Sequence, residues 1–245
     1  MDNYLKETEL LNYRHGSIQR LIAERGWGGL PEKDRILEIY NFVRDEIKFG
    51  YNIDDRIPAS EVLKDHYGQC NTKGILFMAL LRAVKVPCRL HGFTIDKKLQ
   101  KGVINGLWYW IAPRELFHTW VELYYNNRWL NIEGFILDQN YLSSLQHRYR
   151  ECTEGFCGFA VATKNFKNPD INWNEGSTYI QKEAITGDLG VYDDPDTYFS
   201  KYKQKLNPIK KFLYRNVIRY SMNRNVRNIR ENPKISSTRR RGTGR

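Results

Sequence analysis

Residues 66–87 read HYGQCNTKGILFMALLRAVKVP, a polar, turn-prone run followed by an almost wholly apolar stretch. Nearly every residue from Ile75 to Val84 is apolar, which is typical of a helix buried on all sides, and Pro87 predicts its end. Cys70 therefore lies at or just before the start of a central helix. The unpaired N–H groups and the dipole of a helix start stabilise an anion, so a thiol placed there ionises more readily and is a candidate nucleophile. The alternative role for Cys70 is that of a small buried apolar side chain.

The chain before this helix is predicted to be helical as well. Residues 10–27 and 31–47 place apolar side chains at steps of three and four, and Pro31 followed by acids is typical of a helix start. A shorter helix is predicted over residues 57–65. No stretch approaches the roughly 18 consecutive apolar residues that a membrane span needs, so we expect no transmembrane segment.

Residues 117–135, FHTWVELYYNNRWLNIEGF, predict a β-hairpin. Two aromatic and β-branched runs flank the asparagines at 126–127, and asparagine tolerates the positive φ of a tight turn. A two-residue or four-residue loop pairs Tyr124 with Trp129. Because side chains alternate along a strand, this register decides which residues share a face.

In that register His118 and Glu133 are diagonal neighbours on one face, with Cα atoms roughly 7–8 Å apart, so the imidazole and the carboxylate can meet. Together with Cys70 they describe a nucleophile, a base and an acid that orients the base, the arrangement used for acyl transfer through a covalent intermediate. His66, four residues before Cys70, is the competing base. The alternative for His118 and Glu133 is a satisfied sheet histidine and a solvated strand charge.

The run GQCNTKGILFMALLRAVKVPCRLHGF, followed by HTWVELYYNNRWLNIEG, resembles the transglutaminase-like superfamily, which includes papain-like thiol acyltransferases and proteases. Its pattern is Gly-x-Cys at a helix start, then His-x-Trp-x-Glu and a Trp strand that ends in an acid. The resemblance covers residues 35–140 and places Cys70, His118 and Glu133 on the three catalytic positions. It also implies an oxyanion site made by the Cys70 N–H, with Tyr51 or Asn52 in the region of a second donor.

Three departures narrow the range of activities that the resemblance implies. The acid is usually Asp, so Glu133 adds a methylene that the hairpin must accommodate. Asn71 replaces the aromatic residue that follows the nucleophile in crosslinking transglutaminases, and the chain is too short for their β-sandwich domains, so protein crosslinking is not expected. The predicted function is hydrolysis or transamidation of a peptide or amide substrate through a Cys70 acyl-enzyme. The alternative is a catalytically retired binding protein whose basic tail carries the function.

We predict an α+β fold of transglutaminase-like (papain-like) type, with N-terminal helices and the Cys70 helix packed on an antiparallel sheet. Residues 1–60 form the helical N-terminal part, residues 61–200 the catalytic core, and residues 201–245 a basic amphipathic helix with a disordered end.

The positive charge is concentrated in the last of these segments. Residues 201–245 hold 15 Lys and Arg against the single acid Glu231, a net +14, so the other 200 residues carry −3 of the total +11. A possible partner of the chain after Lys201 is therefore a polyanion, either nucleic acid or an anionic membrane surface. The apolar residues among these cations recur at helical spacing: Ile209, Phe212, Leu213, Val217 and Tyr220.

Cysteine usage and the N-terminus indicate the compartment. Four cysteines in 245 residues are too few for a disulfide scaffold, and MDNYLKETEL has neither the basic nor the apolar region of a signal peptide. We therefore expect a cytoplasmic protein with reduced thiols. His147, Cys152 and Cys157 fall short of a four-ligand zinc site, so neither a metal nor a cofactor is predicted.

Overall fold

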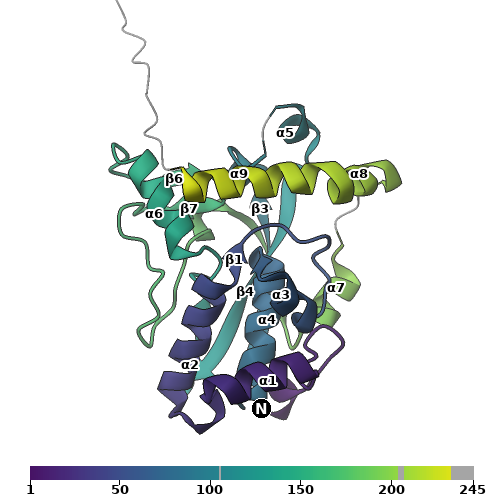
Figure 1. Cartoon of the computed structure of the whole chain (residues 1–245), viewed down its shortest axis with the longest axis vertical. Coiled ribbons are helices and arrows are strands. Elements are labelled where there is room, and N and C mark those ends of the chain that lie inside the picture. The colour runs from purple at the N-terminus through teal and green to yellow at the C-terminus, as the bar shows by residue number, and fades with distance from the viewer. Residues whose placement is uncertain (105, 204–206, 233–245) are drawn as a thin grey trace, which may run out of the picture.

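The computed structural model describes residues 1–104, 106–203 and 207–232, and an antiparallel four-stranded sheet lies at its centre (Figure 1). Helices pack around the sheet, so the chain has the predicted α+β fold. The sheet order is β5 (Arg128–Ile132), β4 (Glu115–Tyr125), β3 (Cys88–Asp96) and β8 (Ile185–Tyr192).

Helix α4 (Cys70–Ala83) runs through the middle of the molecule (Figure 1), and all its residues from Asn71 to Arg82 are buried. It contacts β3 and β4 on one side and the N-terminal helices on the other, which explains why its sequence has no polar face. These helices are α1 (Gly16–Arg25), α2 (Glu32–Asn41) with its π turn η3 (Phe42–Glu46), and α3 (Ala59–Asp65).

The predicted hairpin is formed by β4 and β5, and its register is confirmed. Tyr124 pairs with Trp129, and the two-residue loop places Asn126 and Asn127 at φ 49° and 61°. Both asparagines thus adopt the left-handed conformation that a type I′ turn requires. The pairing continues to Val121 and Ile132, so Glu133 is the first residue past the end of β5.

Short elements connect this core. β1 (Lys48–Phe49) pairs in parallel with β2 (Tyr67–Gly68), and β6 (Phe156–Gly158) pairs antiparallel with β7 (Val161–Thr163). The remaining helices are α5 (Leu107–Ile111), α6 (Gln139–Arg148) and α7 (Pro195–Lys201), and the short 3₁₀ turns are η1 (Asp2–Leu5), η2 (Trp27–Gly29), η4 (Lys97–Gln100) and η5 (Lys182–Ala184).

The basic C-terminal segment forms a long helix that crosses the molecule as a bar (Figure 1). It consists of α8 (Pro208–Leu213), the π turn η6 (Tyr214–Ile218) and α9 (Arg219–Glu231). The predicted helix is present, and it is not a separate extension but packs on the body of the molecule. Met222, Val226 and Ile229 are at most 3% exposed and belong to the main hydrophobic core. The end predicted to be disordered, residues 236–245, lies outside the described residues.

A buried ion pair fastens α9 to the body. Arg230 donates to both carboxylate oxygens of Asp138, with N–O distances of 3.0 and 2.7 Å, and the Asp138 side chain is 1% exposed. The same carboxylate accepts the backbone N–H groups of Phe49 in β1 and of Tyr141 in α6. Burial by itself raises the pKa of Asp138, but the hydrogen bonds and charge of Arg230 and the Phe49 N–H outweigh it and lower that pKa.

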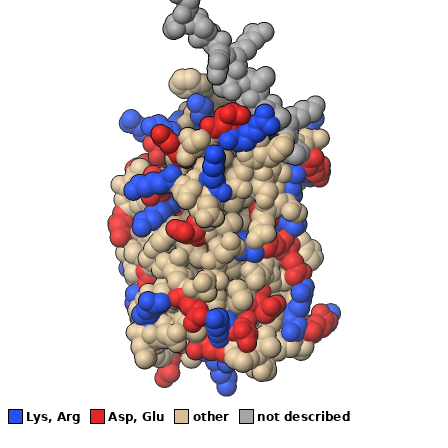
Figure 2. All heavy atoms as spheres, turned by 90° about the vertical axis from the view of Figure 1, so that its left-hand side faces the viewer, with Lys and Arg blue, Asp and Glu red and all other residues tan. Residues whose placement is uncertain are grey.

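The charge on the surface of the body is mixed. Figure 2 shows acidic and basic side chains interspersed over one face, with several Lys and Arg near the top, where the C-terminal helices lie in Figure 1. Within the described residues, every helix is too short or too polar to span a membrane.

Candidate active site

The structure places Cys70 where the sequence predicts it, as the first residue of α4. Gln69 caps the helix, and its backbone N–H donates to Thr72 Oγ1 over 3.1 Å. The Cys70 side chain is half-buried, and its sulfur lies 3.7 Å from the Asn71 side-chain oxygen. It lines a cavity of about 400 Å³, so a substrate carbonyl has room to reach the thiol.

His118 and Glu133 meet as the hairpin register predicts. The Nε2 atom of His118 lies 2.7 Å from Oε1 of Glu133, and both side chains are fully buried. The second Glu133 oxygen accepts the backbone N–H groups of Ile180 and Gln181 over 2.8 and 2.9 Å. These two bonds show how the site accommodates glutamate where aspartate is usual, because the main chain before η5 fixes the longer carboxylate against the imidazole.

The other ring nitrogen of His118, Nδ1, is buried and has no hydrogen-bond partner among the described residues. Burial lowers the pKa of His118, but its interactions with Cys70 and with Glu133 together raise that pKa to about 10. The imidazolium form of His118 is therefore favoured at neutral pH. A neighbouring imidazolium is one of the features that activate a cysteine nucleophile.

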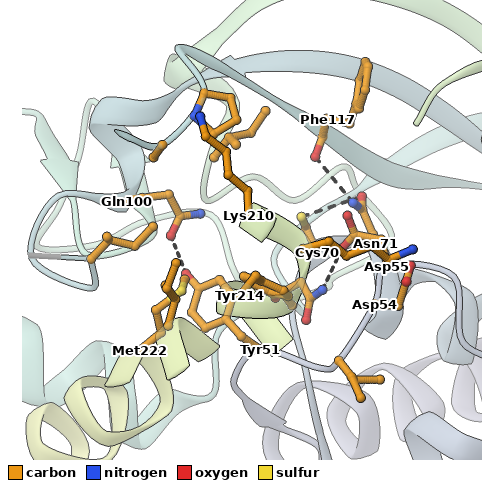
Figure 3. A pocket seen from close by; sticks show the side chains of 18 of the residues that line it. Tyr51, Asp54, Asp55, Cys70, Asn71, Gln100, Phe117, Lys210, Tyr214 and Met222 are labelled. Carbon is orange, nitrogen blue, oxygen red and sulfur yellow. Dashed lines mark hydrogen bonds between the residues drawn. The ribbon is translucent and has the colours of Figure 1, made fainter. Parts of the chain in front are cut away.

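The sequence reasoning missed the wall of the cavity that faces Cys70. Figure 3 shows Cys70 beside Asn71 and Asp55, while Lys210, Tyr214 and Met222 reach toward the same space from the C-terminal helices. No local signal marks these residues, because they come from a segment more than 130 positions away in the sequence.

Asp55 is a further acid at this site. Its carboxylate accepts a hydrogen bond of 2.7 Å from the Gln69 side chain, directly before Cys70. Burial raises the pKa of Asp55 despite the hydrogen bonds from Gln69 and Asn71. The Asp-Asp pair at 54–55 stands in a polar loop and gives no signal in the sequence that points to the cysteine.

The two residues in the region of a second oxyanion donor have different positions. Tyr51 lines the cavity and donates its hydroxyl to the Gln100 side chain. Asn52 is fully buried, and its amide donates to Asp65 and to the Tyr67 carbonyl, which leaves it no donor for a substrate. Its role is to hold Gln69, whose side-chain oxygen accepts the Asn52 N–H.

The competing base is not at the site. His66 is exposed at the end of α3 and does not line the cavity. In the described part of the chain, His, Cys, Asp and Glu side chains form no cluster of three that would hold a metal ion.

Comparison with known proteins gives one family match and one structural likeness. The family model described as the transglutaminase-like superfamily matches residues 22–134. Among solved structures, a candidate cysteine protease from Cytophaga hutchinsonii matches with a TM-score of 0.44 and 13% identity. The match covers 79% of this chain and 47% of that protein, so the chain spans about half of its length. No curated protein matches. Residues 22–134, which this family model matches, contain Cys70, His118 and Glu133.

Proposed function

We propose that this chain is a cysteine-dependent acyl-transfer enzyme that hydrolyses or transamidates an amide or peptide bond. The observation that carries the proposal is the buried His118, held by Glu133 on one ring nitrogen and left without a partner on the other. A sheet histidine with a purely structural role would have both nitrogens satisfied, because an unpaired buried polar atom costs free energy. The charge of Cys70 acts on this histidine, which makes the thiol the natural partner of Nδ1.

In this mechanism the Cys70 thiolate attacks the carbonyl carbon and forms a carbon–sulfur bond. The oxyanion receives the Cys70 backbone N–H, one of the unpaired donors at the start of α4. As the carbon–nitrogen bond breaks, His118 gives its proton to the leaving amine. Water or an amine then attacks the thioester and returns a proton to His118, which releases the acid or the new amide and restores the thiolate.

The half-buried position of Cys70 allows a direct test by alkylation. At about pH 6.5, below the ordinary thiol pKa of about 8.5, iodoacetamide should modify Cys70 faster than Cys157, and mass spectrometry of peptides measures both rates. Cys157 is the matched control, because it is the more exposed thiol and access alone would favour it. Equal rates, or faster modification of Cys157, would contradict an activated Cys70.

Turnover requires a substrate screen. A library of peptides and acyl-amides, incubated with the protein, should yield an acyl adduct on Cys70 and none in Cys70→Ala. Product masses distinguish hydrolysis, which adds water, from transamidation to an added amine. A Cys70 that is alkylated rapidly but acylated by no member of the library would favour the retired binding protein.

A further inference from the structure

The C-terminal helices have two apolar faces, and only one of them packs on the body. Met222, Val226 and Ile229 are buried against it. Ile209, Phe212 and Tyr220 are 70%, 64% and 60% exposed, and Val217 is 44% exposed. Apart from Leu213, which lines the cavity, the stripe that the sequence shows among the cations is therefore this outer face, and the fold leaves it uncovered.

Helix α5 adds to this exposed apolar surface. Leu107 is 69% exposed and Trp110 is 80% exposed. Lys210 of α8 donates to the carbonyl of Ile111 over 3.3 Å, so α5 and α8 are in contact, and Figure 1 shows α5 standing over the C-terminal helices. We call these exposed side chains the apolar rim: Leu107, Trp110, Ile209, Phe212, Val217 and Tyr220.

The surface around the apolar rim is positive. Residues 207–230 contain no acid. Two of their cations are neutralised by the body, since Arg215 pairs with Asp54 and Arg230 with Asp138. Arg224 and Arg227 are exposed, and neither forms an ion pair among the described residues. The charge beside the rim therefore favours a negatively charged partner.

We propose that the apolar rim docks on an anionic lipid surface. A lipid surface accepts both features at once, because apolar side chains enter the boundary of the acyl chains while arginines meet anionic headgroups. The amphipathic ring of Trp110 suits this boundary. Nucleic acid accounts for the arginines only, since it offers no place to bury Leu107, Ile209 and Phe212.

Docking in this way orients the proposed active site. Ile111 of α5 and Lys210 and Leu213 of α8 line the cavity that contains Cys70, and they neighbour rim residues on the same helices. The mouth of the cavity is thus brought to the lipid surface, where Cys70 can meet an amide or peptide bond presented at the membrane. This orientation rests on the proposed function, whereas docking itself does not.

Vesicle sedimentation of the full chain tests the docking. Vesicles of phosphatidylcholine with phosphatidylglycerol should bind the protein, vesicles of phosphatidylcholine alone should bind it far less, and added salt should weaken binding. The double variant W110S/F212S should bind about tenfold or more weakly, because two large apolar side chains no longer enter the interface. V191S is the matched control, since Val191 is an exposed apolar residue on β8, outside the rim.

A second pair of variants separates charge from apolar contact. R224Q/R227Q should also weaken binding to the anionic vesicles, whereas R20Q, at an exposed arginine of α1, should not. Cys70→Ala should bind as the wild type does, so a failed acylation test leaves this result interpretable. Wild type that does not sediment would overturn the proposal, and so would binding that W110S/F212S leaves unchanged. Loss of binding in R224Q/R227Q alone, with a mobility shift on RNA, would assign the surface to nucleic acid instead.

Discussion

His118 is fully buried, and its protonation state depends on two neighbours, Cys70 and Glu133. Its pKa of about 10 reflects the balance between burial, which lowers it, and Cys70 and Glu133, which raise it. Because the ordinary histidine pKa is about 6.5, the folded protein binds this proton more tightly than the unfolded one. The resulting contribution to stability is complete below about pH 6.5 and is lost as the pH rises to about 10.

Removing either neighbour should lower the pKa of His118. In Cys70→Ala and in Glu133→Gln one raising influence is gone while burial remains, so we expect each variant to titrate His118 at a lower pH than the wild type. The measurement is the pH titration of the His118 imidazole signals by NMR. Asn131→Ala, next to the strand end but without contact to His118, is the control and should leave the titration unchanged. A titration that moves with Asn131→Ala but not with Glu133→Gln would contradict the role given to Glu133.

The contact between helices α6 and α9 depends on one ion pair, between Asp138 and Arg230. Replacing Arg230 by Met should destabilise the protein by about 3 kcal/mol or more, since it leaves the Asp138 carboxylate buried and unpaired. Urea unfolding monitored by circular dichroism measures this change in the free energy of unfolding.

Arg227→Met is the matched control for this prediction. Arg227 lies on the same helix and is exposed, so its loss should change the free energy of unfolding by less than about 0.5 kcal/mol. Equal effects of the two substitutions would show that the buried ion pair does not fasten α9 to the body.

Helix α4 and the hairpin were predictable because their signals are local. Ten nearly continuous apolar residues marked a buried helix, and the asparagines at 126–127 fixed the turn that brings His118 to Glu133. The inner face of the C-terminal helices was not predictable in this way. Met222, Val226 and Ile229 are separated by arginine and asparagine, and the π turn at 214–218 shifts the helical phase within the segment that precedes them.

At the scale of the whole molecule, hydrogen bonds join the C-terminal helices to Tyr51 and Asn52, near the N-terminal helices. Asn223 accepts the backbone N–H of Tyr51 over 2.7 Å and donates to the Tyr51 carbonyl over 3.0 Å, and Tyr214 donates its hydroxyl to the Asn52 carbonyl. These partners were not predictable from the sequence, because backbone groups carry no residue-specific signal and the separations exceed 160 positions.

A chain that ends at Lys203 should therefore lose stability. Without α8, η6 and α9, the core residues that contact Met222, Val226 and Ile229 become exposed and Asp138 has no ion-pair partner. We expect a lower Tm and a broader thermal transition, measured by calorimetry, than for the full chain. A chain that ends at Asn232 keeps these helices and is the control, which should unfold as the full chain does. Identical transitions for the two truncated chains would show that the body folds by itself.

The placement of α8 and α9 over the cavity has a consequence during protein synthesis. Ribosomes make the chain from the N-terminus, so Cys70, His118 and Glu133 emerge well before Tyr214 and Met222. The nascent chain thus contains Cys70 before both walls of its cavity have been made. If Cys70 carries out the proposed acyl transfer, we expect the site to become competent only after translation has passed α9.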